Sequence, residues 1–145
     1  SGYLCDMTRV FSRGRLSDEA YRLHNISIEM VHSLADMIKP GVACCELFEK
    51  AEAIIKKYGV AEHYMEKFNN TRFTGHGVGM EINEPPVITK NNKLPLEKGM
   101  TIAIEPKFAL KGIGGIGIEN TYAVTDTGYE LLTEMDESIM LFNER

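Results

Sequence analysis

Two stretches in the first half of the chain carry apolar residues at the three- and four-residue steps of an amphipathic helix. In the first stretch, Ser17 can cap the helix, and Asp18 and Glu19 suit the positive end of the helix dipole. Pro40-Gly41 is expected to end this helix. The apolar positions that predict its buried face are Leu23, Ile26, Met30, Leu34 and Met37–Ile38.

The second stretch predicts a helix from about Cys44 to Tyr58. Gly59 suits the left-handed residue that commonly ends a helix. The apolar face of this stretch consists of Leu47–Phe48, Ala51, Ile54–Ile55 and Tyr58. Two consecutive amphipathic helices must bury their apolar faces against another layer, and a sheet is the expected partner.

From residue 72 onward, short apolar runs are separated by Gly, Pro and Asn, which is typical of an antiparallel sheet. Residues 3–11 alternate loosely and predict one further strand ahead of the helices, with Ser12-Arg13-Gly14 as the turn after it. Helices followed by strands indicate an α+β fold, in which helices cover an antiparallel sheet. We expect residues 1–145 to form part of one domain.

Composition and charge exclude several classes of function. The net charge is −5 and no basic cluster occurs, so nucleic-acid binding is not expected. No apolar run approaches the roughly 18 residues that a membrane span requires. Three cysteines, two of them adjacent, form no disulfide framework and indicate a cytoplasmic protein.

Four candidate metal ligands lie beside glycine, proline or strand signals: Asp6, His76, Glu105 and Glu119. Glycine on both sides of His76 leaves its imidazole uncrowded, and Glu105 and Glu119 each follow an apolar run. Taken singly, the histidine could be incidental in a glycine-rich hairpin and each carboxylate could face water. Together they form a hard ligand set that suits Mn²⁺, Co²⁺, Fe²⁺ or Zn²⁺, with enough carboxylates for two ions.

The motifs that contain these residues occur in a familiar order. They are Gly2–Arg9, Gly75–Gly79, Glu84–Pro86, Gly99–Met100 with Ile104–Pro106, and Ile118–Glu119 with Thr125–Thr133. The chain resembles the creatinase/prolidase/aminopeptidase P group, the M24-type metallopeptidases with the pita-bread fold. That resemblance implies a pita-bread domain and a centre of two divalent metal ions, Mn, Co or Zn.

The resemblance also implies a role for each candidate. Asp6, His76, Glu105 and Glu119 match four of the family's five metal ligands, and the first aspartate would lie ahead of Ser1. We therefore expect an N-terminally truncated chain that is the C-terminal part of the catalytic domain. Asn83 and Arg72 stand where the family usually has histidines that touch substrate, and Gly117 stands where an arginine is common.

By the same resemblance, Glu105 and His76 are the catalytic residues of a hydrolase that cleaves short peptides, with proline after the scissile bond as the favoured substrate. A homodimer is expected. Two alternatives remain open at this point: a non-catalytic binding module with the same fold, and a creatinase-like hydrolase that cleaves a C–N bond in a small molecule.

Overall fold

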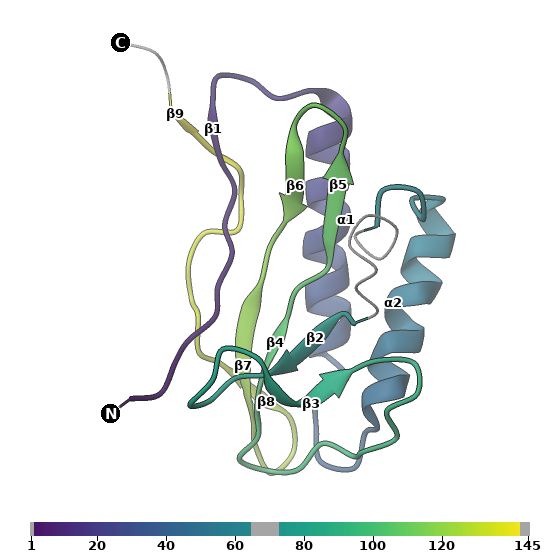
Figure 1. Cartoon of the computed structure of the whole chain (residues 1–145), viewed down its shortest axis with the longest axis vertical. Coiled ribbons are helices and arrows are strands. Elements are labelled where there is room, and N and C mark those ends of the chain that lie inside the picture. The colour runs from purple at the N-terminus through teal and green to yellow at the C-terminus, as the bar shows by residue number, and fades with distance from the viewer. Residues whose placement is uncertain (1, 65–72, 143–145) are drawn as a thin grey trace.

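The structure is a computed structural model, and it describes residues 2–64 and 73–142. Two helices lie side by side on one face of the molecule (Figure 1). Helix α1 spans Asp18–Ala35 and helix α2 spans Cys44–Tyr58. The Ser17 hydroxyl accepts the backbone N–H of Ala20 at the start of α1, as its sequence predicts. Gly59 ends α2 in the left-handed conformation, with φ 64°.

Five antiparallel strands form the main sheet, in the order β3-β2-β4-β7-β8. The strands are β2 (Gly75–Gly77), β3 (Glu84–Ile88), β4 (Thr101–Ile104), β7 (Asn120–Val124) and β8 (Tyr129–Leu131). Each strand is antiparallel to its neighbours, so the predicted antiparallel sheet is confirmed. Since β2, β4 and β7 are adjacent, residues far apart in the sequence meet at the centre of this sheet.

Two smaller pairs of strands flank the main sheet. Strands β5 (Lys107–Leu110) and β6 (Gly114–Gly117) form a hairpin that lies over α1. Strand β1 (Phe11–Arg13) pairs in parallel with β9 (Met140–Phe142), so the segment ahead of α1 lies beside the last described residues (Figure 1).

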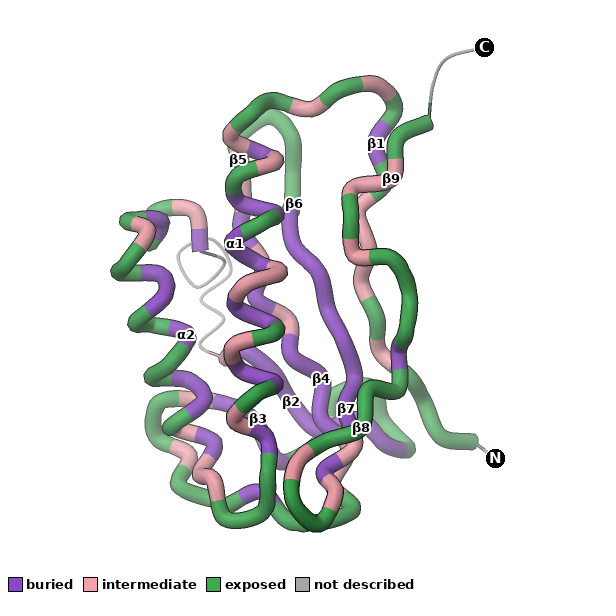
Figure 2. The backbone as a smooth tube through the Cα atoms, turned by 180° about the vertical axis from the view of Figure 1, so that it is seen from behind, coloured by how far each residue is buried: buried purple, intermediate pink, exposed green. Residues whose placement is uncertain are grey.

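The apolar faces of both helices meet the sheet in a single core. Helix α1 packs against β4 and the β5–β6 hairpin, and α2 packs against β3. The buried side of α1 faces buried segments of the strands (Figure 2). The predicted apolar faces are confirmed, because Leu23, Met30, Leu34, Leu47 and Ala51 are all almost fully buried.

Two predictions about local structure are corrected. Residues 3–11 do not form a continuous strand: this segment bonds Gly79 through Leu4 and forms an isolated bridge between Thr8 and Glu119 before β1 begins. The segment has strand-like composition, but in the described part of the chain no neighbouring strand runs along its length to complete a ladder. Helix α1 ends at Ala35, ahead of Pro40, although Ile38 still packs in the core. Within residues 2–64 and 73–142, neither helix has the length and apolar character needed to cross a membrane.

Candidate metal centre

Four elements deliver the four predicted ligands to one end of the sheet. Asp6 lies in the extended segment before β1, and His76 lies in the middle of β2. Glu105 follows the last residue of β4, and Glu119 precedes the first residue of β7. The register pairs His76 with Ala103, and Ile104 with Asn120, so Glu105 adjoins β4 next to β2, and Glu119 adjoins β7 on the other side of β4. The fold also brings Asp6 beside Glu119, which lies more than a hundred positions later in the sequence.

The glycines beside His76 are required by the close approach of three strands. A Cβ atom at Gly75 would overlap the backbone oxygen of Ala103 on β4, and one at Gly77 would overlap that of Pro85 on β3. Side chains are therefore excluded on both sides of the histidine. His76 donates from Nδ1 to the backbone oxygen of Gly77 at 3.0 Å, and this bond orients the ring. Nε2 then points at the carboxylates.

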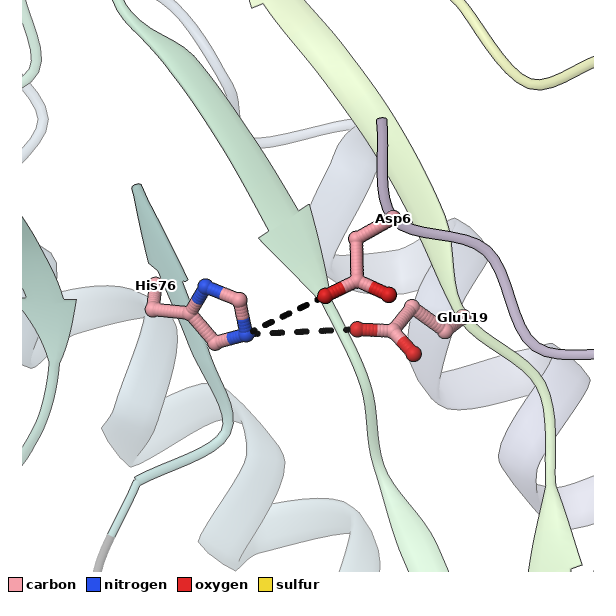
Figure 3. Close-up of side chains that lie close together, drawn as sticks. All are labelled: Asp6, His76 and Glu119. Carbon is pink, nitrogen blue, oxygen red and sulfur yellow. Dashed lines mark ion pairs between the residues drawn. The ribbon is translucent and has the colours of Figure 1, made fainter. Parts of the chain in front are cut away.

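The imidazole Nε2 of His76 faces all three carboxylates. It lies 3.0 Å from Glu105 Oε1, 3.9 Å from Asp6 Oδ2 and 4.0 Å from Glu119 Oε1. Figure 3 shows Asp6 and Glu119 converging on the ring from neighbouring segments. Ligand atoms of Asp6, His76 and Glu119 all lie within 4.8 Å of one another, which is close enough for the three residues to hold one metal ion.

A lysine that the sequence analysis did not single out also enters this cluster. Lys107 Nζ donates to Glu105 Oε2 at 2.6 Å and to Glu119 Oε2 at 3.1 Å. The hydroxyl of Thr8 donates to the same oxygen of Glu119 at 2.6 Å. The sequence contains no motif that points to this lysine. Lys107 follows Glu105 by two positions and begins the next strand, so its contact with Glu119 depends on how the strands are arranged.

The charges in the cluster shift one another's titration. Burial disfavours the charged form of His76, but its bonds to Glu105 and Gly77 outweigh this and raise its pKa. Burial alone would raise the pKa of Glu105, yet His76 and Lys107 hold it below the usual value. Burial and the nearby Glu105 charge raise the pKa of Glu119. Burial lowers the pKa of Lys107, but bonding to Glu105 and the Glu119 charge raise it overall.

The donor set fits a divalent metal ion. Glu119 is almost fully buried, and its Oε1 atom has no hydrogen-bond partner among the residues that the structure describes. A buried carboxylate oxygen without a partner is unfavourable unless a cation lies nearby. Within residues 2–64 and 73–142, three carboxylates outnumber the two cationic groups that bond them, Lys107 and protonated His76, which favours binding of a further cation. Carboxylate and imidazole ligands are those that Mn²⁺, Co²⁺ and Zn²⁺ accept.

The remaining predicted site residues lie outside this cluster or outside the described chain. Asn83 is exposed in the turn that leads into β3, directly before Glu84, which pairs with Gly77. Arg72 lies outside the residues that the structure describes. Gly117 ends β6 directly opposite Lys107. The substrate-binding roles of Asn83 and Arg72 therefore remain predictions.

Sequence reasoning also missed a buried serine that supports both glutamates. Ser27 on α1 donates its hydroxyl to the backbone oxygen of Pro106 at 2.7 Å and accepts the N–H of Ile118 at 3.0 Å. These two residues directly follow Glu105 and precede Glu119. A serine within an apolar helix face is the one sequence signal that could have revealed this link.

Comparison with known proteins identifies the family. Residues 1–126 match the model of metallopeptidase family M24. The chain belongs to metallopeptidase family M24. As an M24 chain, it is 35% identical over 135 residues to an uncharacterized peptidase of Staphylococcus aureus, an alignment that covers 93% of this chain and 37% of the relative.

Two further matches resemble this M24 chain along nearly its whole length. A Xaa-Pro dipeptidase of Lactobacillus helveticus is 31% identical over 140 residues, covering 97% of this chain and 36% of the relative. The crystal structure of X-Pro aminopeptidase from Thermotoga maritima superimposes with a TM-score of 0.88 at 33% identity, covering 97% of this chain and 38% of that one. The predicted pita-bread fold is confirmed. The chain spans somewhat more than a third of the length of these relatives.

Proposed function

We propose that the protein containing this sequence is a metal-dependent peptidase that cleaves short peptides at X-Pro bonds. The observation that carries the proposal is the convergence of Asp6, Glu105 and Glu119 on Nε2 of His76, beside a Glu119 Oε1 atom that has no hydrogen-bond partner among the described residues. Membership of family M24 supports a metallopeptidase. The X-Pro preference is supported by relatives that are named Xaa-Pro dipeptidase and X-Pro aminopeptidase.

Each residue of the cluster has a defined task in this proposal. Asp6, His76, Glu105 and Glu119 would hold the metal, and divalent ions in such a site lower the pKa of bound water and polarise the scissile carbonyl. Glu105 is the general base: its depressed pKa keeps the carboxylate ready to accept the proton of the attacking water. The same carboxyl group then delivers that proton to the leaving nitrogen. The Nδ1 bond to Gly77 keeps the His76 ring in position.

The finer points belong to the same proposal. We propose two metal ions, Mn, Co or Zn, since three carboxylates can bridge two cations. Asn83 would donate a hydrogen bond to the substrate from the turn before β3, and Arg72 would contact the substrate as well. We also propose that the protein forms a homodimer and that it is located in the cytoplasm. The three unpaired cysteines support the cytoplasmic location.

The first experiment measures metal content and peptidase activity together. The protein containing this sequence is analysed for bound metals and assayed with a panel of X-Pro dipeptides, alongside dipeptides that lack proline. Bound divalent metal together with hydrolysis of the X-Pro panel supports the proposal. Absence of bound metal after incubation with Mn²⁺, Co²⁺ or Zn²⁺ would instead favour a non-catalytic binding module.

A second experiment tests the role of Glu105. Glu105→Ala should lower kcat by about 100-fold or more, because a positioned general base contributes at least that much. Bound metal should still be detectable, because Asp6, His76 and Glu119 keep three ligand atoms within 4.8 Å of one another. The exposed Glu97 gives a matched control, since Glu97→Ala removes a carboxylate away from the cluster. Unchanged turnover in Glu105→Ala would refute the assignment of the base.

A further inference from the structure

Lys107 is placed in the metal centre by the register of a hairpin. It begins β5 and stands directly opposite Gly117, the last residue of β6. A Cβ atom at Gly117 would lie 3.1 Å from the Cα atom of Lys107 and 2.6 Å from the backbone oxygen of Pro106. Position 117 thus cannot carry a side chain without displacing the backbone. The lysine supplies the positive charge on this side of the cluster.

The ammonium group of Lys107 occupies carboxylate oxygens that a metal ion would need. It bonds Oε2 of both Glu105 and Glu119, while Oε1 of Glu105 faces His76. Both bonds join opposite charges in a mostly buried setting, where such bonds are strong. A metal ion that approaches these two glutamates must break the bonds or bind beside a fixed positive charge. Either event lowers the net affinity for the metal.

Lys107 also has space to leave the cluster without unfolding the hairpin. It lines a groove of about 300 Å³ together with residues 8–11 and 115–117. Gly115 and Gly117 add no side chains to this groove. An ammonium group displaced from the glutamates therefore has this groove beside it.

We propose that Lys107 is a tethered cation that competes with divalent metal ions for the carboxylates of Glu105 and Glu119. The inference rests on the proposed function, because it presupposes that these glutamates bind metal. The lysine stabilises the metal-free cluster and sets a threshold of metal concentration below which the cluster remains metal-free. Loading of the site then depends on the supply of metal as well as on the ligands.

The test compares metal binding by the protein that contains this sequence and by variants of this lysine. Mn²⁺ is titrated into the metal-free protein by isothermal titration calorimetry. Lys107→Met keeps much of the side-chain length without the charge, and should bind Mn²⁺ about tenfold more tightly or better, which corresponds to about 1.4 kcal/mol. Lys107→Arg retains the charge and should bind Mn²⁺ like the parent protein. Lys98→Met is the matched control, because Lys98 pairs with the exposed Asp126.

Thermal unfolding gives a second measurement, and its result differs if Lys107 has only a structural role. Metal-free Lys107→Met should melt below the parent, because two largely buried carboxylates lose their positive partner. Saturating Mn²⁺ replaces that charge, so the difference between the two melting temperatures should shrink. A lysine with only a structural role would leave the same difference with and without Mn²⁺.

The outcomes separate this inference from the proposed function. Equal or weaker Mn²⁺ affinity in Lys107→Met, with binding by the parent intact, overturns the competition and leaves the metal centre standing. Absence of Mn²⁺ binding by the parent and by every variant overturns the metal centre, and the competition with it. The inference is supported if Lys107→Met binds Mn²⁺ more tightly while Lys107→Arg and Lys98→Met do not. The difference in melting temperature between Lys107→Met and the parent should also shrink in Mn²⁺.

Discussion

Replacing Ser27 by alanine should destabilise the protein through two buried hydrogen bonds. The Ser27 side chain is fully buried and bonds the carbonyl of Pro106 and the N–H of Ile118. Ser27→Ala leaves both backbone groups without this partner. A hydrogen bond contributes about 1 kcal/mol net, and an unsatisfied buried group costs about 1–3 kcal/mol. The free energy of unfolding should therefore fall by about 2–4 kcal/mol.

Urea denaturation measures this loss directly. With an m value of about 2 kcal/mol/M, the midpoint should fall by about 1–2 M while m stays unchanged. Ser138→Ala is the control, because its hydroxyl bonds Asp136 at the exposed surface. That control should change the free energy of unfolding by no more than about 0.5 kcal/mol.

The same substitution should also loosen the metal centre. Pro106 and Ile118 adjoin Glu105 and Glu119, so their backbone bonds to α1 limit the movement of both carboxylates. Ser27→Ala should therefore bind Mn²⁺ more weakly than the parent in the same calorimetric titration. A change in unfolding free energy below about 0.5 kcal/mol would refute the reasoning, because it would mean that neither buried bond contributes.

Three further predictions concern backbone space, packing and pH. Gly117→Ala should lower the free energy of unfolding, measured by urea denaturation, by about 1–3 kcal/mol, because its Cβ would lie 2.6 Å from a backbone oxygen. Gly115→Ala should leave this free energy nearly unchanged, because a Cβ there meets nothing within 4 Å. Leu34→Ala should cost about 2–5 kcal/mol by opening a cavity in the core, while the half-exposed Leu141→Ala should change little. Burial lowers the pKa of His24 in the folded protein below its value of about 6.5 in the unfolded chain. Below about pH 6.5 the unfolded chain therefore binds more protons, and the free energy of unfolding should fall as the pH drops below that value. His24→Gln should remove this part of the pH dependence.

Each of these predictions has a result that would contradict it. Equal midpoints for the alanine variants at 117 and 115 would show that the close backbone contact is relieved without cost. A loss in Leu34→Ala no larger than that of Leu141→Ala would contradict the packing of α1 against the sheet. Parallel curves of unfolding free energy against pH for the parent and His24→Gln would show that burial of His24 does not affect its titration.

The sequence by itself determined the two helices and the identities of the candidate ligands. Ser17 and Gly59 mark helix ends through bonds made within a few residues, and the apolar spacing of α2 selects its buried face without knowledge of the partner. His76 and the glutamates stood out because glycine, proline and apolar neighbours surrounded charged or polar residues. These are local signals, and they survive without tertiary contacts.

Only the tertiary structure decided which residues share the site. Strand-like composition at residues 3–11 was misleading, because a strand requires a neighbour along its length, and among the described residues this segment makes isolated backbone bonds ahead of β1. Lys107 gave no local signal, because its place depends on the register of β5 with β6. Ser27 stood out only as a serine in an apolar helix face, and its partners depend on the docking of α1 against that hairpin. Hydrogen bonds between residues distant in sequence depend on how the elements pack, and packing is a property of the whole chain rather than of any short segment of it.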